Sequence, residues 1–275
     1  MKMLAYLTML LFFLMSAIGG ERGIKSFFTL FINGIIAFIS IYLMGFKAST
    51  MVVMVISTIL FSVVTIFFQN GWNLKTKTSM IACACILLLL GSCIFSFLWN
   101  AHISGFNEID LQNADASYMS SDLSLSMFQI MLVSFIWSML GALVDTSIAV
   151  SSAMYEVYQQ EPYMKRQKLF YKGLKLGEDI IGTMINTLIF VGLGESMMLI
   201  FYYQNYQYEW YRMLNSKSLL QDLSGVLFSC ISCSLIIPMT ALVFAVLAKH
   251  IESRKHIESR EHIESRNEKN SSISE

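Results

Sequence analysis

The sequence has few charged residues, few prolines and no net charge. These features limit the classes of protein to which it can belong. Charged residues make up 14% of the 275 positions and apolar residues 55%, whereas a soluble domain carries roughly 25% charged residues. With two prolines in the chain, the apolar residues fall into blocks of about 20, the length that a helix needs to cross a bilayer. Nineteen basic and nineteen acidic residues cancel, so no overall field attracts nucleic acid.

Catalytic and metal-binding motifs are missing as well. We find no His-Glu-x-x-His, Gly-x-Ser-x-Gly or phosphate-binding loop, so we expect neither an enzyme nor a bound cofactor. Three of the four histidines lie in the C-terminal repeats at six-residue spacing. On a helix this spacing turns successive side chains in different directions, so we expect no metal site. All five cysteines lie inside apolar segments, and no disulfide framework is implied.

Seven apolar segments predict an all-α, polytopic membrane bundle of about seven transmembrane helices within residues 1–248. Open sheets would leave backbone groups unpaired in lipid, and the period-two alternation of a membrane barrel is absent. Residues 249–275, with the repeats HIESRK, HIESRE and HIESRN, are interpreted as a polar tail. The predicted segments are Met3–Ile18, Phe27–Gly45, Ser49–Phe68, Met80–Trp99, Met127–Met154, Ile180–Tyr203 and Gly225–Ala248.

The basic residues indicate an orientation. Fifteen lie in one set of alternate connections and four in the other, and cytoplasmic connections are the ones enriched in Lys and Arg. We therefore expect a membrane protein with its N-terminus outside and its C-terminal tail in the cytoplasm. The first segment resembles a secretory signal, but cleavage would leave basic residues outside, so we interpret it as a retained helix. The segment 100–126 is then outside, with the acidic residues Glu108, Asp110, Asp115 and Asp122.

A polar stripe in the fifth segment surrounds one acidic residue, Asp145. An ionisable group costs ~2.5 kcal/mol or more at the centre of a membrane helix, so it needs a partner, water or a function. Small residues at this spacing also let helices approach closely, and we assign that packing role to Ser138, Gly141 and Ala149. Steps of three and four residues place the whole stripe on one helix face: Ser134, Ser138, Gly141, Asp145, Ala149, Ser152 and Glu156.

The sixth segment offers a second polar face. Asn186 lies about seven residues from the cytoplasmic end of this segment, at a depth similar to that of Asp145. Our hypothesis is that Asp145 accepts hydrogen bonds from Asn186 and from Thr183 or Thr187, as a static clamp or as part of a site for a proton or cation. Gly182 is assigned to helix packing. The face consists of Asp179, Gly182, Thr183, Asn186 and Thr187.

These two stretches resemble the YibE/F family of bacterial multi-pass membrane proteins. The similarity rests on the Gly and Asp of one helix, the Ser and Glu that follow, and Asp-x-x-Gly-Thr-Met-x-Asn-Thr-Leu in the next helix. The resemblance implies a permease-like protein of the bacterial plasma membrane, of the short YibF type, that is paired with a longer YibE-type membrane partner. After Gly194 the chain departs from the family pattern with Glu195. The matching residues are Gly141, Asp145, Ser152, Glu156, Asp179, Gly182, Thr183, Met184, Asn186, Thr187 and Leu188.

Three further features of the sequence bear on catalysis and on contact with the membrane surface. Gly192-Leu-Gly194-Glu195 has the spacing of intramembrane aspartyl proteases, but Glu195 lies nine residues from Asn186, on the opposite helix face. We therefore expect no acidic dyad with Asp145, and predict that Glu195 faces water or a partner. The basic segment 163–177 is typical of an amphipathic helix on anionic headgroups, or of a charge cluster that only sets topology. A run of aromatic residues between 202 and 211 is typical of an interfacial belt.

Three hypotheses about function remain. The first is a transporter or transporter subunit in which the polar residues around Asp145 and Asn186 bind or conduct a small solute or ion. The second is a non-transporting scaffold or subunit whose polar face docks a membrane partner. An intramembrane enzyme is the weakest, because no catalytic motif supports it.

Overall fold

The regular structure is entirely helical in the part of the chain that a computed structural model describes, residues 2–46, 48–103, 126–161, 164–205 and 207–271. Six helical stretches in these ranges are long and apolar enough to cross a bilayer. The predicted all-α, multi-pass membrane fold is confirmed. The elements are α1 (Lys2–Gly45), α2 (Thr50–Val63), a π-helical turn η1 (Val64–Phe68), α3 (Leu74–Ala101), α5 (Met127–Gln160), α6 (Arg166–Asn205), α7 (Trp210–Leu214) and α8 (Lys217–Ser271).

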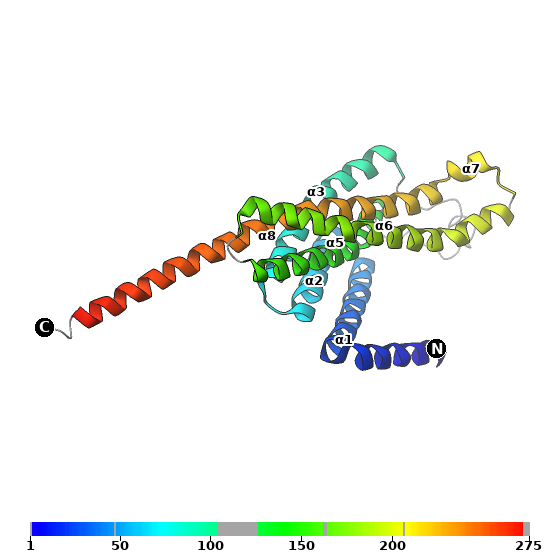
Figure 1. The fold of residues 1–275 in the computed structure, drawn as a ribbon. Helices are drawn as coiled ribbons and strands as arrows, with labels where there is room; N and C mark the ends of the chain where they lie inside the picture. The colour runs from blue at the N-terminus through cyan, green and yellow to red at the C-terminus, as the bar shows by residue number, and fades with distance from the viewer. Residues whose placement is uncertain (1, 47, 104–125, 162–163, 206, 272–275) are drawn as a thin grey trace.

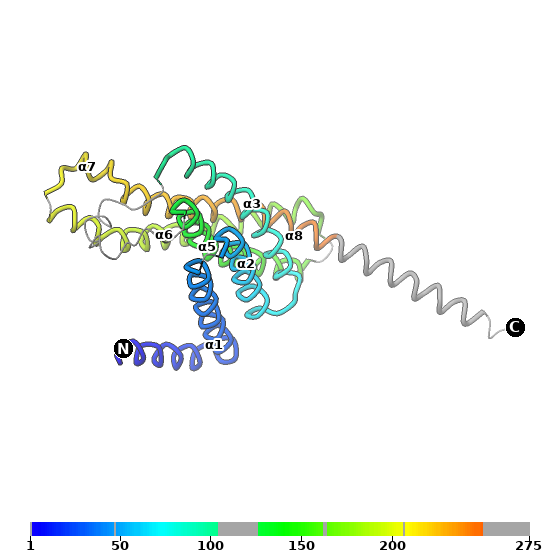
Figure 2. The backbone as a smooth tube through the Cα atoms, turned by 180° about the vertical axis from the view of Figure 1, so that it is seen from behind, coloured from blue at the N-terminus to red at the C-terminus, as the bar shows by residue number. Residues whose placement is uncertain are grey.

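The first two predicted segments are joined in α1, which is broken at one residue. Gly20 has φ 54° and ψ −135°, a conformation that glycine adopts readily because it has no Cβ. The chain turns sharply there, and α1 lies at the edge of the molecule in both views (Figures 1 and 2). Its second arm is held by a hydrogen bond of 2.9 Å from Asn33 Nδ2 to Thr65 Oγ1 of η1.

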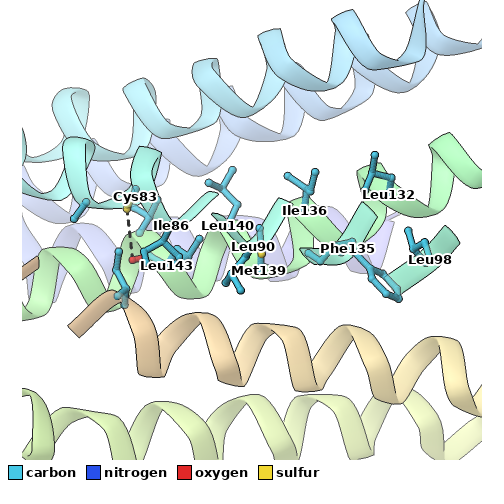
Figure 3. Close-up of a cluster of buried hydrophobic side chains, with 14 of the residues drawn as sticks. Cys83, Ile86, Leu90, Leu98, Leu132, Phe135, Ile136, Met139, Leu140 and Leu143 are labelled. Atoms are coloured by element: carbon cyan, nitrogen blue, oxygen red, sulfur yellow. Dashed lines mark hydrogen bonds between the residues drawn. The ribbon is translucent and has the colours of Figure 1, made fainter. Parts of the chain in front are cut away.

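The largest apolar core lies where α3, α5 and α8 meet. Side chains from α3 and α5 interdigitate along the two helices, and the Cys83 thiol donates to the Leu143 carbonyl oxygen at 3.7 Å (Figure 3). Met139, Leu143 and Ile94 are fully buried here. All five cysteines are free, as their placement inside the apolar segments indicates.

Helix α6 packs against α8 through glycines that leave no room for a side chain. A Cβ built on Gly177 collides with Ile237 Cγ2, and one built on Gly192 collides with Val226 Cγ2. At Gly173 the built Cβ lies 2.9 Å from the Cβ of Ala241. These contacts fix the distance between α6 and α8.

Hydroxyl pairs join neighbouring helices. Ser138 meets Ser229 at 3.3 Å and Ser147 meets Thr240 at 3.2 Å, both between α5 and α8. Ser79 of α3 and Ser151 of α5 lie 2.8 Å apart and are fully buried. Such pairs satisfy hydroxyl groups that would otherwise be buried without a partner.

The Ser79–Ser151 pair gives a modest stability prediction. Ser79→Ala and Ser151→Ala should each lower the free energy of unfolding by about 0.6–1.7 kcal/mol, the range for hydrogen bonds between membrane helices. The double variant should lose little more than either single one, because both remove the same bond. Denaturant unfolding of the four proteins in detergent measures the coupling, and additive losses would contradict it.

The basic segment, which the structure describes from Met164 onward, is part of a long helix rather than a helix of its own. From Arg166 onward it is the first part of α6, and its apolar side packs inside the protein. Leu169 is 1% exposed and contacts a core shared with Met154 and Phe244. Amphipathicity alone does not distinguish a lipid-facing helix from one that packs against a neighbouring helix, because both bury one stripe.

Two sets of predicted residues lie partly or wholly outside the residues that the structure describes. The acidic residues Glu108, Asp110, Asp115 and Asp122 lie outside the described residues, as does Tyr206 of the predicted aromatic belt. Helix α8 continues from the bundle through Ser271, into the range predicted as a polar tail.

Candidate functional site

The predicted polar stripe of α5 lies on an open face of the helix along most of its length. Ser134, Ser138, Gly141 and Asp145 are all exposed, while Ala149 and Ser152 are half-buried. Glu156 is exposed near the end of α5. The hydroxyl-bearing residues that are fully buried, Thr146, Ser147 and Ser151, belong to the neighbouring face. The stripe is therefore a surface that continues along α5 rather than the centre of the helix interface.

Asp145 lacks the predicted hydrogen bonds. The Thr183 hydroxyl donates to the Ile180 carbonyl at 2.8 Å and the Thr187 hydroxyl to the Thr183 carbonyl at 2.9 Å, so both are satisfied within α6. Asn186 is exposed and makes no hydrogen bond with a described residue. The Asp145 carboxylate instead lies within electrostatic range of the Cys233 thiol of α8.

The polar face of α6 points away from α8. Asp179, Gly182, Thr183, Asn186 and Thr187 are all exposed. Asn186 follows Gly177, which contacts α8, by nine residues and therefore lies on the opposite side of α6. The polar faces of α5 and α6 are thus both open, but no hydrogen bond joins them in the described part of the chain.

The glycines assigned to helix packing do not contact a neighbouring helix among the residues that the structure describes. A Cβ built on Gly141 or Gly182 meets no atom of a described residue within 4 Å, so the described helices leave both positions open. Ser138 does contact another helix, through its hydrogen bond to Ser229. Spacing by itself identified the small residues but not which of them a neighbouring helix covers, because that depends on how the helix is rotated in the bundle.

An open cavity of about 350 Å³ lies at the other end of the α5 stripe and is lined by residues of α5, α6 and α8. It contains Ser134 and Ser138 of the predicted stripe and the Glu195 carboxylate of α6. Helix α8 contributes Gln221 and Asp222 from its first turns. Apolar side chains complete the wall: Met127, Ile130, Met131, Phe135, Gly225 and Val226.

The cavity is acidic and reaches into the span. Two carboxylates line it, and none of its lining residues is Lys, Arg or His. It extends from Met127, the first residue of α5, to Ser138, about 16 Å further along the helix at 1.5 Å per residue. Asp145 lies two turns beyond Ser138 on the same stripe. Such a cavity favours a cation, a proton or a cationic small molecule over an anion.

Gln221 and Asp222 are site residues that the sequence analysis did not single out. They precede the predicted start of the last segment, Gly225, because hydropathy places segment ends where polar residues begin. In the structure α8 begins at Lys217 and carries them helically into the cavity wall. The Gln221 amide donates to the carbonyl of Ile103, just after the end of α3, at 2.7 Å and ties this turn of α8 to that segment. In the sequence, the indication of their role is that Gln221 and Asp222 are adjacent polar residues just before an apolar segment.

No group of three or more His, Cys, Asp or Glu side chains is placed to hold a metal ion within the described ranges. The cavity acids Glu195 and Asp222 come from different helices and are accompanied by hydroxyl and amide groups. This donor set suits a weakly held, hydrated or organic cation better than a tightly coordinated metal.

Comparisons with known proteins agree with the resemblance drawn from the two motif helices. The model of a family described as "YibE/F-like protein" matches residues 7–250, which is most of the chain. No curated protein and no solved structure matches the chain.

Proposed function

The chain belongs to the YibE/F-like family, and on this premise we propose that it is a permease-like transporter, or the transporting subunit of a larger complex, for a small cationic solute or ion. The observation that carries the proposal is the acidic cavity among α5, α6 and α8, which contains Glu195 and Asp222 and no basic residue. Carboxylates that line a cavity without a basic residue attract a cation in preference to an anion.

The stripe of α5 supplies the continuation of the route. Beyond Ser138, the exposed residues Gly141 and Asp145 extend the polar line toward the middle of the helix. The Asp145 carboxylate accepts no hydrogen bond from a described residue. It could therefore bind a cation or proton that has left the cavity. Ser152 and Glu156 then lead toward the opposite end. We propose that this end, with Arg166 and its neighbouring lysines, faces the cytoplasm.

Charge movement in proteoliposomes tests the proposal. Reconstituted protein on a solid-supported membrane is exposed to concentration jumps of H⁺, Na⁺, K⁺, Mg²⁺ or Mn²⁺, and at least one jump is expected to evoke a current. Asp145→Asn should abolish this current while the protein keeps its elution volume and helix content, because the change removes a charge and keeps the size. Failure of every cation to move charge would contradict the cation-transport proposal.

A second candidate function is a non-transporting subunit that docks a membrane partner. The observation that favours it is the open polar face of α6, since 11% of the apolar span of α6 is buried against 50% in α8. On this face the Asn186 amide would be a hydrogen-bond donor toward a partner helix. The Thr183 hydroxyl, which donates to the Ile180 carbonyl, could only accept one. In that case Asp145→Asn or Asn186→Leu should disrupt the isolated complex, and wild-type protein should move no charge.

A further inference from the structure

A groove at the basic end of the bundle combines a cationic rim with an apolar floor. It lies between the start of α6 and α8 and has a volume of about 440 Å³. The rim is formed by exposed polar side chains, and the floor by Ala245, which is 1% exposed. The lining residues are Arg166, Gln167, Phe170, Tyr171, Leu242 and Ala245.

We propose that this groove binds one anionic phospholipid, whose phosphate is held by Arg166, Gln167 and Tyr171 and whose acyl chain lies over Leu242. This proposal does not depend on what the acidic cavity transports, since the groove is at the other end of α6.

Arg166 is the cation best placed to hold a phosphate. Lys168 and Lys172 are already directed to Glu161, whose carboxylate oxygens lie 3.8 and 3.2 Å from their ammonium groups. Arg166 is exposed and makes no ion pair with a described residue. A guanidinium forms two parallel hydrogen bonds with a phosphate, which a lysine cannot do.

The first turn of α6 adds a second, independent attraction for an anion. Arg166 and Gln167 are the first two residues of this 40-residue helix, where backbone N–H groups lack intrahelical partners and the helix dipole is positive. The Gln167 amide and the Tyr171 hydroxyl are further donors on the same rim, and Tyr171 is 69% exposed.

The apolar part of the groove selects a lipid over a soluble phosphate. Leu242 is 46% exposed and lies seven residues before Lys249, so it is about 10 Å further into the apolar span of α8. Phe170 packs on the core beside it. A headgroup at Arg166 therefore places an acyl chain along an apolar wall that a free phosphate would leave exposed.

Native mass spectrometry of the full chain in detergent tests the site, with phosphatidylglycerol, neutral phosphatidylcholine and glycerol 3-phosphate as probes. Phosphatidylglycerol should bind at least about fivefold more tightly than phosphatidylcholine. Arg166→Gln should weaken phosphatidylglycerol binding about fivefold, the equivalent of one basic residue near a membrane surface. Lys175→Gln is the matched control, because Lys175 is exposed on the opposite face of α6 and carries the same charge.

Leu242→Trp tests the apolar half without changing any charge. By filling the groove, this change should weaken phosphatidylglycerol binding as much as Arg166→Gln does. If Arg166→Gln does not fold, unchanged binding in Leu242→Trp would overturn the proposal. Equal losses in Arg166→Gln and Lys175→Gln would reduce the site to general surface attraction and overturn the proposal. Glycerol 3-phosphate that displaces the lipid at equal concentration would overturn the acyl-chain contact.

Discussion

Gly177→Val is expected to lower the free energy of unfolding by about 2–3 kcal/mol, one of the largest effects of any single change in this protein. A Cβ at this position collides with Ile237 Cγ2 of α8. That methyl group sits on a β-branched side chain with one preferred rotamer in a helix, so it cannot swing aside. The helices must separate, and overpacking of this kind costs about 1–3 kcal/mol. Loss of the neighbouring contacts at Gly173 adds to the effect.

Gly182→Val on the same helix is the matched control. A Cβ on Gly182 meets no atom of the described part of the chain within 4 Å. Valine is a slightly better helix former than glycine, so stability should change by less than about 0.5 kcal/mol. Ile237→Ala should restore part of the loss in the Gly177→Val background, although it creates a cavity by itself. Thermal and denaturant unfolding in detergent measure all four variants, and equal losses at both glycines would show that Gly177 is not an interhelical contact.

Hydropathy predicted the helices because lipid imposes one rule on the whole chain: every backbone group in the span must be hydrogen-bonded within a helix. It could not predict the ends. Helix α6 begins at Arg166 rather than Ile180, since a polar segment remains helical when one of its faces packs on a neighbour, as Leu169 does. Nor did hydropathy anticipate that a single residue, Gly20, would separate the first two arms, because that break depends on φ and not on polarity.

The candidate site was predictable only in part. Periodicity identified the α5 stripe, and Ser134 and Ser138 do line the acidic cavity. Depth along the helix suggested a hydrogen bond between Asp145 and Asn186, but depth says nothing about rotation, and α6 is turned so that Asn186 faces away from α8. That rotation is set by Gly173, Gly177 and Gly192, whose role becomes visible only when Ala241, Ile237 and Val226 are placed against them. Residues that meet across three helices leave no pattern in a single segment.

Glu195→Gln is expected to raise the half-saturating concentration of the transported cation by about tenfold. The change keeps the size and hydrogen-bonding groups of the side chain and removes one of the two negative charges that line the cavity. A carboxylate about 6 Å from a monovalent cation contributes roughly 3 kcal/mol at an effective dielectric constant of 20. Glu195 is exposed, so ions and water screen this attraction, and about half of it, near 1.4 kcal/mol or a factor of ten, is the expected loss. The measurement is the concentration dependence of the charge-movement current in proteoliposomes.

Glu178→Gln is the control for Glu195→Gln, since it removes the same charge from an exposed glutamate of α6 that does not line the cavity. Its half-saturating concentration should stay within about twofold of the wild-type value. Combining Glu195→Gln with Asp222→Asn leaves the cavity without a carboxylate. Saturable current should then disappear, because no negative charge remains in the cavity to concentrate the cation. An unchanged half-saturating concentration in the double variant would mean that the cation does not pass through the cavity. If the current still required Asp145, the cation would then have to reach that residue along the open face of α5.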